Sequence, residues 1–303
     1  MLVGLTARAQ YDAAFTNYWA LQSYFNPAAS GLAGQLNIQG AYSLQLLGFE
    51  NAPSTMLATA DMPLFFIGPR HGVGAGFMND DIGLWSNKKF YIQYAYHQPL
   101  WGGNLSIGVR PGFLTDTFDG SEVDLGQSGD PAFPTSQVSG NAFDLDAGVR
   151  YTYKKIWYVG MSAMHCMAPT IHLGDDKNNE ISISPLLCMT GGYNIKFRAP
   201  QYQLMTSAIL RSDMKNWRGD VTARLGYNNE KLNMYAGLGY SPTNSVSVLV
   251  GGVFAGFKVG YSYEIYTRGV GALNGTHELV VGYQTDLNLS KKGKNLHKSV
   301  RIL

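Results

Sequence analysis

KVGYSYEIYT, residues 258–267, alternates two kinds of residue with a period of two. One face carries Val259, Tyr261, Tyr263 and Ile265, and the other carries Lys258, Gly260, Ser262 and Glu264. A strand of a soluble domain turns its apolar face to a protein core. A strand of a membrane barrel turns that face to lipid and its small or polar face to an aqueous interior. The rest of the chain decides between these two environments.

The composition favours the membrane barrel. The chain has 303 residues, of which 45% are hydrophobic and only 15% are charged, and it is rich in glycine (36) and tyrosine (19). Its mean hydropathy of -0.10 is that of a polar protein, as expected when lipid-facing and lumen-facing residues average out along each strand. No stretch approaches the roughly 18 to 20 apolar residues of a membrane-spanning helix. The net charge of +2 indicates no general affinity for nucleic acid.

The alternation recurs throughout the chain. In FDLDAGVRYTY, residues 143–153, Asp144, Asp146 and Arg150 share one face, where a protein core would hold them poorly. The pattern predicts fourteen strands, at about 36–48, 54–66, 71–82, 87–98, 103–114, 142–153, 156–166, 183–197, 202–211, 217–228, 231–240, 244–253, 257–267 and 276–287. An even number of long strands predicts an all-β fold, a transmembrane antiparallel outer-membrane β-barrel over residues 36–287.

The connections support this arrangement. Short turns follow the even-numbered strands, whereas the three longest connections, 115–141, 167–182 and 268–275, all follow odd-numbered strands. Outer-membrane barrels have short periplasmic turns and longer external loops, so this alternation is expected for them. We expect the acidic, Gly- and Pro-rich connection 115–141 to be irregular.

Three segments lie outside the predicted barrel. Residues 1–9 resemble the end of a signal peptide, with Ala7 and Ala9 before a cleavage site. Residues 10–35 are rich in aromatic residues that need burial, and we predict that they form a plug or periplasmic segment at the periplasmic mouth of the barrel or in its lumen. Residues 288–303 form a basic periplasmic tail that is either solvated or a partner contact, through Lys291, Lys292, Lys294, Lys298 and Arg301.

No motif predicts catalysis, a cofactor or a metal. The six histidines, His71, His97, His165, His172, His277 and His297, form no recognisable triad with a nucleophile. His165, Cys166 and His172 lack the spacing of a tetrahedral metal site. HGVGAGF, residues 71–77, lacks the helix and Lys-Ser/Thr of a phosphate loop, and its glycines suit a close-fitting interior instead. Cys166 and Cys188 are out of register in neighbouring predicted strands, which favours free thiols.

Several stretches together resemble the PorP/SprF membrane proteins of the type IX secretion system of Bacteroidetes bacteria. They are YFNPAASG (24–31), FENAPST (49–55), GVGAGFMNDDIG (72–83), LSIGVRPGF (105–113), VGYSYE (259–264) and NGTHELVVGY (274–283). The motif positions within them are Asn26, Pro27, Gly31, Ala52, Pro53, Gly72, Gly74, Gly76, Asn79, Gly83, Gly260, Tyr261, Tyr263, His277 and Glu278. These pieces follow the family's order over most of the chain.

The resemblance implies a non-catalytic outer-membrane barrel that supports secretion or surface attachment of cargo with a C-terminal sorting domain. It also implies contact with the periplasmic ring of that machinery, made of a lipoprotein and its partner. Two other functions stay open from the sequence. One is a transport channel for a small or hydrophobic substrate, which a steady conductance would reveal, and the other is a surface lipase, which hydrolysis dependent on one Ser or His would reveal.

Overall fold

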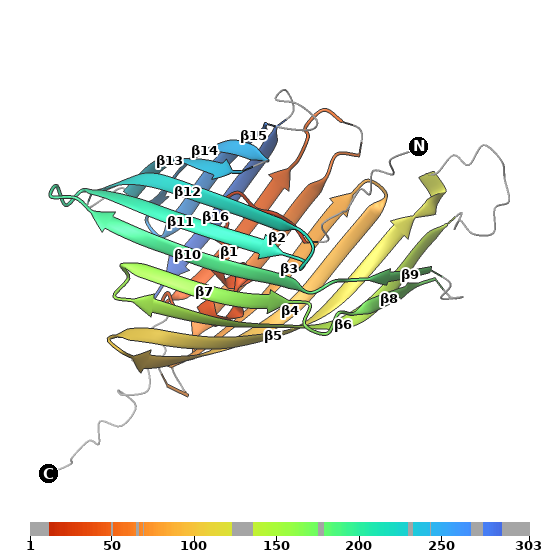
Figure 1. The fold of residues 1–303 in the computed structure, drawn as a ribbon, viewed down its shortest axis with the longest axis horizontal. Coiled ribbons are helices and arrows are strands. Elements are labelled where there is room, and N and C mark those ends of the chain that lie inside the picture. The colour runs from red at the N-terminus through yellow and green to blue at the C-terminus, as the bar shows by residue number, and fades with distance from the viewer. Residues whose placement is uncertain are drawn as a thin grey trace, which may run out of the picture.

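The fold is a closed, antiparallel β-barrel of fourteen strands, seen in a computed structural model (Figure 1). The structure describes residues 12–49, 51–64, 67–68, 70–122, 136–174, 179–229, 233–242, 244–267 and 275–286. Each strand pairs with its neighbour in the chain, except that β7 pairs with β10, and β1 pairs with β16 to close the barrel. The predicted fold class and strand number of the barrel are therefore confirmed.

The strand bounds follow the predicted ranges to within a few residues at most ends. The barrel strands are β1 (Leu36–Leu44), β2 (Ser54–Pro63), β3 (His71–Ile82), β4 (Trp85–Leu100), β5 (Gly103–Asp119), β6 (Gln137–Tyr153), β7 (Trp157–Met164), β10 (Leu186–Lys196), β11 (Tyr202–Ser212), β12 (Trp217–Asn228), β13 (Asn233–Ser241), β14 (Ser245–Phe254), β15 (Phe257–Tyr266) and β16 (Thr276–Thr285). None of the helices in the described ranges is both long and apolar enough to cross a membrane.

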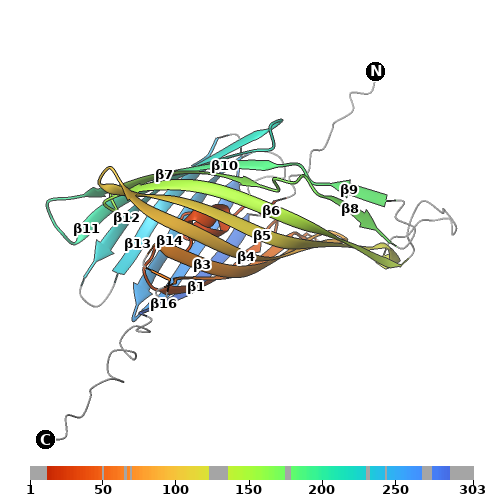
Figure 2. The same ribbon diagram turned by 90° about the horizontal axis from the view of Figure 1, so that it is seen from below.

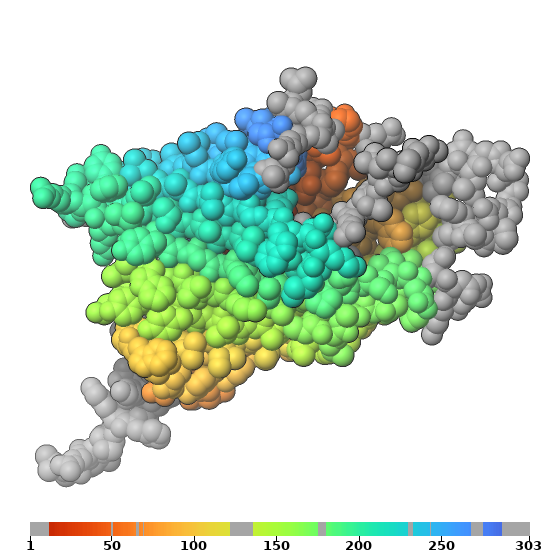
Figure 3. All heavy atoms as spheres, viewed as in Figure 1, coloured from red at the N-terminus to blue at the C-terminus, as the bar shows by residue number. Residues whose placement is uncertain are grey.

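The outer surface of the barrel is apolar and its interior is polar. In β15, Val259 is 52% exposed and Tyr261 is 39% exposed on the outside, while Ser262 and Glu264 are buried inside. The same alternation runs along the other strands, and the side chains of the green-to-cyan strands form a continuous flank (Figure 3). An apolar exterior around a polar interior is the reverse of a soluble fold, and it suits contact with lipid.

The two ends of the barrel differ, as the connection lengths predict. At one end, here called the short-turn end, β4 and β5 are joined through Trp101 and Gly102, and β14 and β15 through Ala255 and Gly256. All four residues have positive φ angles, from 47° to 85°, which two-residue hairpin turns of type I′ require. The other end, here called the loop end, carries the three longest connections.

The expectation that residues 115–141 are irregular is wrong at both ends of that connection, and the connection between β7 and β10 contains a hairpin that the sequence did not predict. Residues 115–119 and 137–141 are not irregular but extend β5 and β6, with pairs such as Thr115 to Asn141. Residues 170–182 contain a hairpin of β8 (Thr170–Leu173) and β9 (Asn179–Ser182). Ile171, Leu173 and Ile183 pack on Leu114 of β5, and this apolar cluster supplies the burial that a solvated loop would lack.

The segment before β1 lies inside the barrel. It contains a helical turn, α1 (Gln22–Phe25), followed by the 3-10 turn η1 (Pro27–Ala29). In Figure 2 this red coil is enclosed by the barrel strands. Its aromatic side chains form the centre of the main apolar cluster, with Tyr24 edge-on to both Phe15 and Phe25.

Some predicted segments fall outside the described residues. These are the signal-peptide remnant, residues 1–9, the first two residues of the segment 10–35, and the basic tail 288–303. The domain boundaries stay a prediction. Cys166 and Cys188 are both free thiols, as expected.

Candidate functional site

The lumenal segment, residues 12–35, lies so close to the barrel wall that the wall needs glycine. A Cβ at Gly108 would lie 2.3 Å from the backbone nitrogen of Ala28, and one at Gly148 would lie 2.2 Å from Oδ1 of Asn26. A Cβ at Gly72 would lie 2.1 Å from the carbonyl oxygen of Ser30. No real Cβ approaches other atoms so closely, so these glycines form a groove that fits the segment.

The Asn-Pro-Ala turn is fixed to this groove by hydrogen bonds. Asn26 accepts from the backbone N–H of Ala28 through Oδ1, and its Nδ2 donates to the carbonyl of Val149 at 3.0 Å. Ser162 Oγ donates to the carbonyl of Phe25 at 2.6 Å. Pro27 follows Asn26 at the first position of η1, where proline's missing N–H leaves no donor unsatisfied. The family-motif residues Asn26 and Pro27 therefore hold the segment against the wall.

Gly31 ends this part of the segment. Its backbone N–H donates to Oδ2 of Asp61 at 2.9 Å, and its φ angle is +76°. Its Cα also lies against Gly72, so two motif glycines from distant parts of the sequence meet here.

Glu278 anchors the other end of the lumenal segment. Its buried carboxylate accepts the backbone N–H of Thr16 at 2.7 Å, and both the backbone and the side-chain amide of Asn17 at 2.8 Å. The preceding His277 points to the outer face, where its Nδ1 lies 2.7 Å from the hydroxyl of Tyr261. The adjacent motif residues His277 and Glu278 thus lie on opposite faces of β16.

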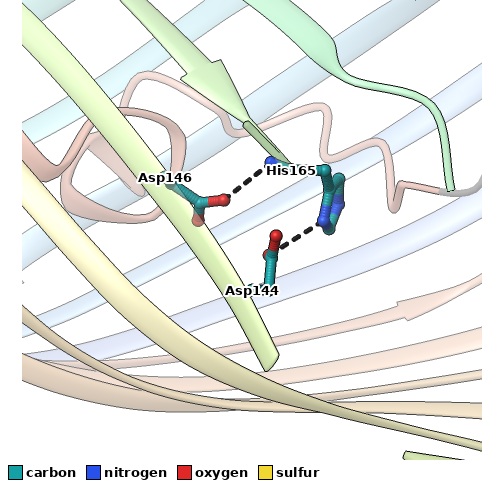
Figure 4. Close-up of side chains that lie close together, drawn as sticks. All are labelled: Asp144, Asp146 and His165. Carbon is teal, nitrogen blue, oxygen red and sulfur yellow. Dashed lines mark hydrogen bonds and ion pairs between the residues drawn. The ribbon is translucent and has the colours of Figure 1, made fainter. Parts of the chain in front are cut away.

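A cluster of buried charges lies at the centre of the barrel, toward the loop end. Asp146 on β6 accepts from Nζ of Lys89 at 2.9 Å and from Nε of Arg110 at 2.5 Å. Asp144 accepts from the same Lys89 at 2.7 Å and lies 2.8 Å from Nδ1 of His165. Figure 4 shows both aspartates pointing from β6 toward His165, whose backbone N–H donates to Asp146 at 2.9 Å.

The cluster also holds the lumenal segment. Arg110 donates through Nη1 to the carbonyl oxygen of Tyr24, and Nε2 of His165 lies 3.1 Å from Oδ1 of Asp12. Burial alone would lower the pKa of His165, but the carboxylates of Asp12 and Asp144 raise it to about 9. Burial alone would raise the pKa of Asp12, but His165 lowers it overall. Both groups are therefore charged at neutral pH and form an ion pair.

The donor set of this cluster suits a salt-bridge network better than a metal site. The ligand atoms of Asp144, Asp146 and His165 lie within 4.8 Å of one another. The carboxylates, however, already accept bonds from Lys89 and Arg110, whose charges would repel a metal cation. The groups that a metal would need are thus already neutralised.

One histidine does contact a serine hydroxyl. Nδ1 of His97 lies 2.8 Å from Oγ of Ser106, and its Nε2 lies 2.9 Å from the carbonyl oxygen of Ser30. A backbone carbonyl stands where a hydrolase triad has its carboxylate or amide, and Ser106 is fully buried. The pair therefore fits a role in fixing the lumenal segment. His71 and His172 lie elsewhere, the latter near Glu180 in the β8–β9 hairpin.

The remaining motif positions serve the barrel itself. A Cβ at Gly74 or Gly76 would clash with the inward side chains of Gln93 or Tyr91, and one at Gly260 would clash with Tyr235. Gly83, with φ of +62°, lies in the tight turn between β3 and β4, while the side chain of nearby Asn79 bonds to Asp81. Ala52 and Pro53 precede β2, and the ring of Tyr263 packs against that of His277 at an interplanar angle of 47° outside the barrel. None of these contacts the lumenal segment directly among the interactions described.

Sequence reasoning missed the charged cluster as a unit. The inward positions of Asp144 and Asp146 were predicted, but their partners Lys89, Arg110 and His165 come from other elements. Their shared inward parity on β4 and β5 was the available signal for Lys89 and Arg110. Nothing in the sequence pairs Asp12 with His165, which are far apart along the chain.

Comparisons with known proteins agree with this architecture. The chain is similar in structure to the CymD monoaromatic hydrocarbon channel, with 12% identity over 91% of this chain and 95% of that one and a TM-score of 0.51. A TodX deltaS2S3 mutant, also a monoaromatic hydrocarbon channel, shows 10% identity over 84% and 90% with a TM-score of 0.50. The Ralstonia pickettii toluene transporter TbuX shows 14% identity over 86% and 92% with a TM-score of 0.48. At these identities the likeness to CymD and TodX shows the fold alone, and the match to TbuX carries no argument.

No curated protein matches the chain. A family model, described as type IX secretion system membrane protein PorP/SprF, matches residues 7–283. This match spans the lumenal segment and all fourteen barrel strands up to Tyr283 in β16. The chain belongs to the PorP/SprF family of type IX secretion system membrane proteins.

Proposed function

We propose that this barrel acts non-catalytically in type IX secretion, supporting the secretion or surface attachment of cargo with C-terminal sorting domains. In this proposal the loop end faces the cell exterior and the short-turn end faces the periplasm. There it contacts the periplasmic ring of the machinery, a lipoprotein and its partner. The basic residues Lys291, Lys292, Lys294, Lys298 and Arg301 follow the last strand and are proposed as one such contact.

The observation that carries the proposal is the anchored lumenal segment. Phe15, Tyr18, Leu21, Tyr24 and Phe25 are all buried inside the barrel. Fully burying side chains of this kind is favourable by about 1.5–3 kcal/mol each, before the entropic cost of ordering the segment. The segment therefore acts as a plug of the lumen. A plugged barrel suits a secretion component better than a freely open pore does.

The polar anchors support the same role. The segment is bound at its start by Glu278 and His165, in its middle by Arg110 and Ser162, and near its end by Asp61. Because these bonds are spread along the barrel wall, the segment can leave only when several of them break together. An event of this kind would have to be driven by a partner, and ring proteins or cargo are the partners that the family suggests.

The test combines a cellular and a reconstituted measurement. In the native host, deletion of the gene should abolish export of a reporter that carries a type IX sorting domain, and the wild-type gene should restore it. In planar bilayers the purified protein should be closed. A Glu278→Ala variant should open more often, while a variant of the outward His277, His277→Gln, should behave as wild type.

Two outcomes would contradict the proposal. Normal reporter export in the deletion strain would remove the secretion role. A steady wild-type conductance that a small apolar solute blocks would point instead to a transport channel.

A further inference from the structure

A cavity of about 1200 Å³ lies inside the barrel between the lumenal segment and the short-turn end. Trp19 and Ala29 of the segment line one side of the cavity. The turn residues Trp101 and Lys154 line the opposite side, at the short-turn end. The continuous hydrogen-bonded wall separates it from the lipid-facing surface. We call this cavity the vestibule, and a ligand would enter it from the short-turn end.

The vestibule is strongly cationic. Its lining includes five basic residues and one carboxylate: Arg150, Lys154, Lys155, Arg224 and Lys258 against Asp61. The carboxylate of Asp61 accepts hydrogen bonds from the backbone N–H of Gly31 and from the side-chain amide of Asn37. Within the described part of the chain, none of the five cations forms an ion pair. Asp61 interacts electrostatically with Lys258 and offsets one positive charge, so the lining keeps an excess of positive charge that the described wall does not pair.

Two of these cations are buried arginines held in position. The guanidinium of Arg224, a residue 5% exposed, lies 3.5 Å from the ring centroid of Trp19, and its Nη2 donates to Ser207 at 2.9 Å. Its Nε is buried with no hydrogen-bond partner among the described atoms. Arg150 is also 5% exposed and stacks 3.8 Å from the ring of Tyr158, with Nε donating to Thr152. Stacking fixes each planar group, so little side-chain freedom is lost when a carboxylate binds.

We propose that the vestibule binds an acidic peptide segment of a partner protein, with its carboxylates on Arg150 and Arg224. Guanidinium groups bind carboxylates through paired, charge-assisted hydrogen bonds. The volume exceeds that of most small-molecule pockets, so it accommodates a short stretch of chain. A membrane lipid is disfavoured because the closed wall gives its acyl chains no path into the lumen.

The chain's own tail is a poor occupant. Residues 287–303 carry Lys291, Lys292, Lys294, Lys298 and Arg301 and no acidic residue, so like charges oppose its entry. A partner from the periplasm remains, and that location rests on the proposed function. Binding of the peptide itself does not depend on it.

The test uses the full-length protein in detergent or nanodiscs and a short peptide of alternating Glu and Ala residues with an uncharged dye. Fluorescence anisotropy should show binding that salt weakens, whereas the matched Gln and Ala peptide should bind at least tenfold more weakly. The double variant Arg150→Gln/Arg224→Gln should lose about tenfold or more in affinity, since each charge-assisted bond is worth at least that factor. The Arg224→Lys variant should retain part of the wild-type affinity for the acidic peptide.

The controls separate this site from general charge and from misfolding. Lys215→Gln removes an exposed charge in the turn between β11 and β12 and should bind as wild type. Heat-dependent gel migration confirms that each variant is a folded barrel. Equal binding of the two peptides, undiminished binding to the double arginine variant, or displacement of the peptide by a short-chain anionic lipid would each overturn the proposal. If the deletion strain secretes normally while binding depends on the arginines, the secretion role fails and the peptide site stands.

Discussion

Replacing Asp146 by alanine gives the sharpest test of how the barrel holds its lumenal segment. This buried carboxylate accepts from Lys89, from Arg110 and from the backbone N–H of His165. In the variant, Lys89 keeps Asp144 as a partner. Arg110 keeps backbone carbonyls of the segment and the rings of Tyr24 and Tyr91, but it has no carboxylate partner left inside the barrel.

The expected cost follows from the burial of the pair. Both side chains are fully inaccessible to solvent, and removing one partner of a buried ion pair costs about 3–5 kcal/mol because the other charge stays buried. We therefore expect Asp146→Ala to lower the free energy of unfolding by about that amount. Asp81 is partly exposed near the end of β3, and Asp81→Ala should cost no more than about 1 kcal/mol.

The measurement is denaturant unfolding in detergent micelles, followed by tryptophan fluorescence. A double variant, Asp146→Ala/Arg110→Leu, should be more stable than the sum of the single effects predicts, by about 0.5–3 kcal/mol, because it leaves no unpaired guanidinium. An Asp146→Ala protein within 1 kcal/mol of wild type, or strict additivity with Arg110→Leu, would refute the reasoning.

Three further predictions concern the outer face, the glycine groove and pH. Val259→Arg should weaken bilayer insertion by about 2–4 kcal/mol, measured by folding into vesicles, whereas Val259→Leu should not; equal behaviour would contradict the assigned facing. Gly148→Ala should push Asn26 off the wall and expose the lumenal segment to protease, and unchanged protection would contradict the close fit. The pKa of His165 is raised, so its ion pair with Asp12 contributes fully below about pH 6.5 and is lost as the pH rises through about 9. Protease cleavage of the segment should increase over that range in wild type, and a His165→Gln variant should show no such step.

The sequence predicted the barrel because the deciding signal is local. Strict alternation along residues such as Val259, Gly260 and Tyr261 is a property of each strand alone, and the lengths of the connections order the strands. The prediction from the sequence was wrong for residues 115–119 and 137–141, because their polar composition resembles that of a loop. There the strand is stabilised by pairing, as between Phe118 and Val138, which no local pattern reveals.

The family motifs marked several residues of the site without showing what they do. Asn26 and Glu278 were singled out from their motifs, and the structure adds that both hold the lumenal segment. The charged cluster was not predicted, since Lys89, Arg110 and Asp146 come from three strands. Strand pairing alone decides that their side chains meet.

The sequence by itself determined that this chain is a membrane barrel with an apolar exterior, because a period of two assigns every residue to one face. Only the tertiary structure decided how the predicted plug segment is held in the interior. Closing the wall brings glycines, carboxylates and arginines from distant strands around one aromatic segment, and that fit depends on distances across the lumen that no linear pattern contains.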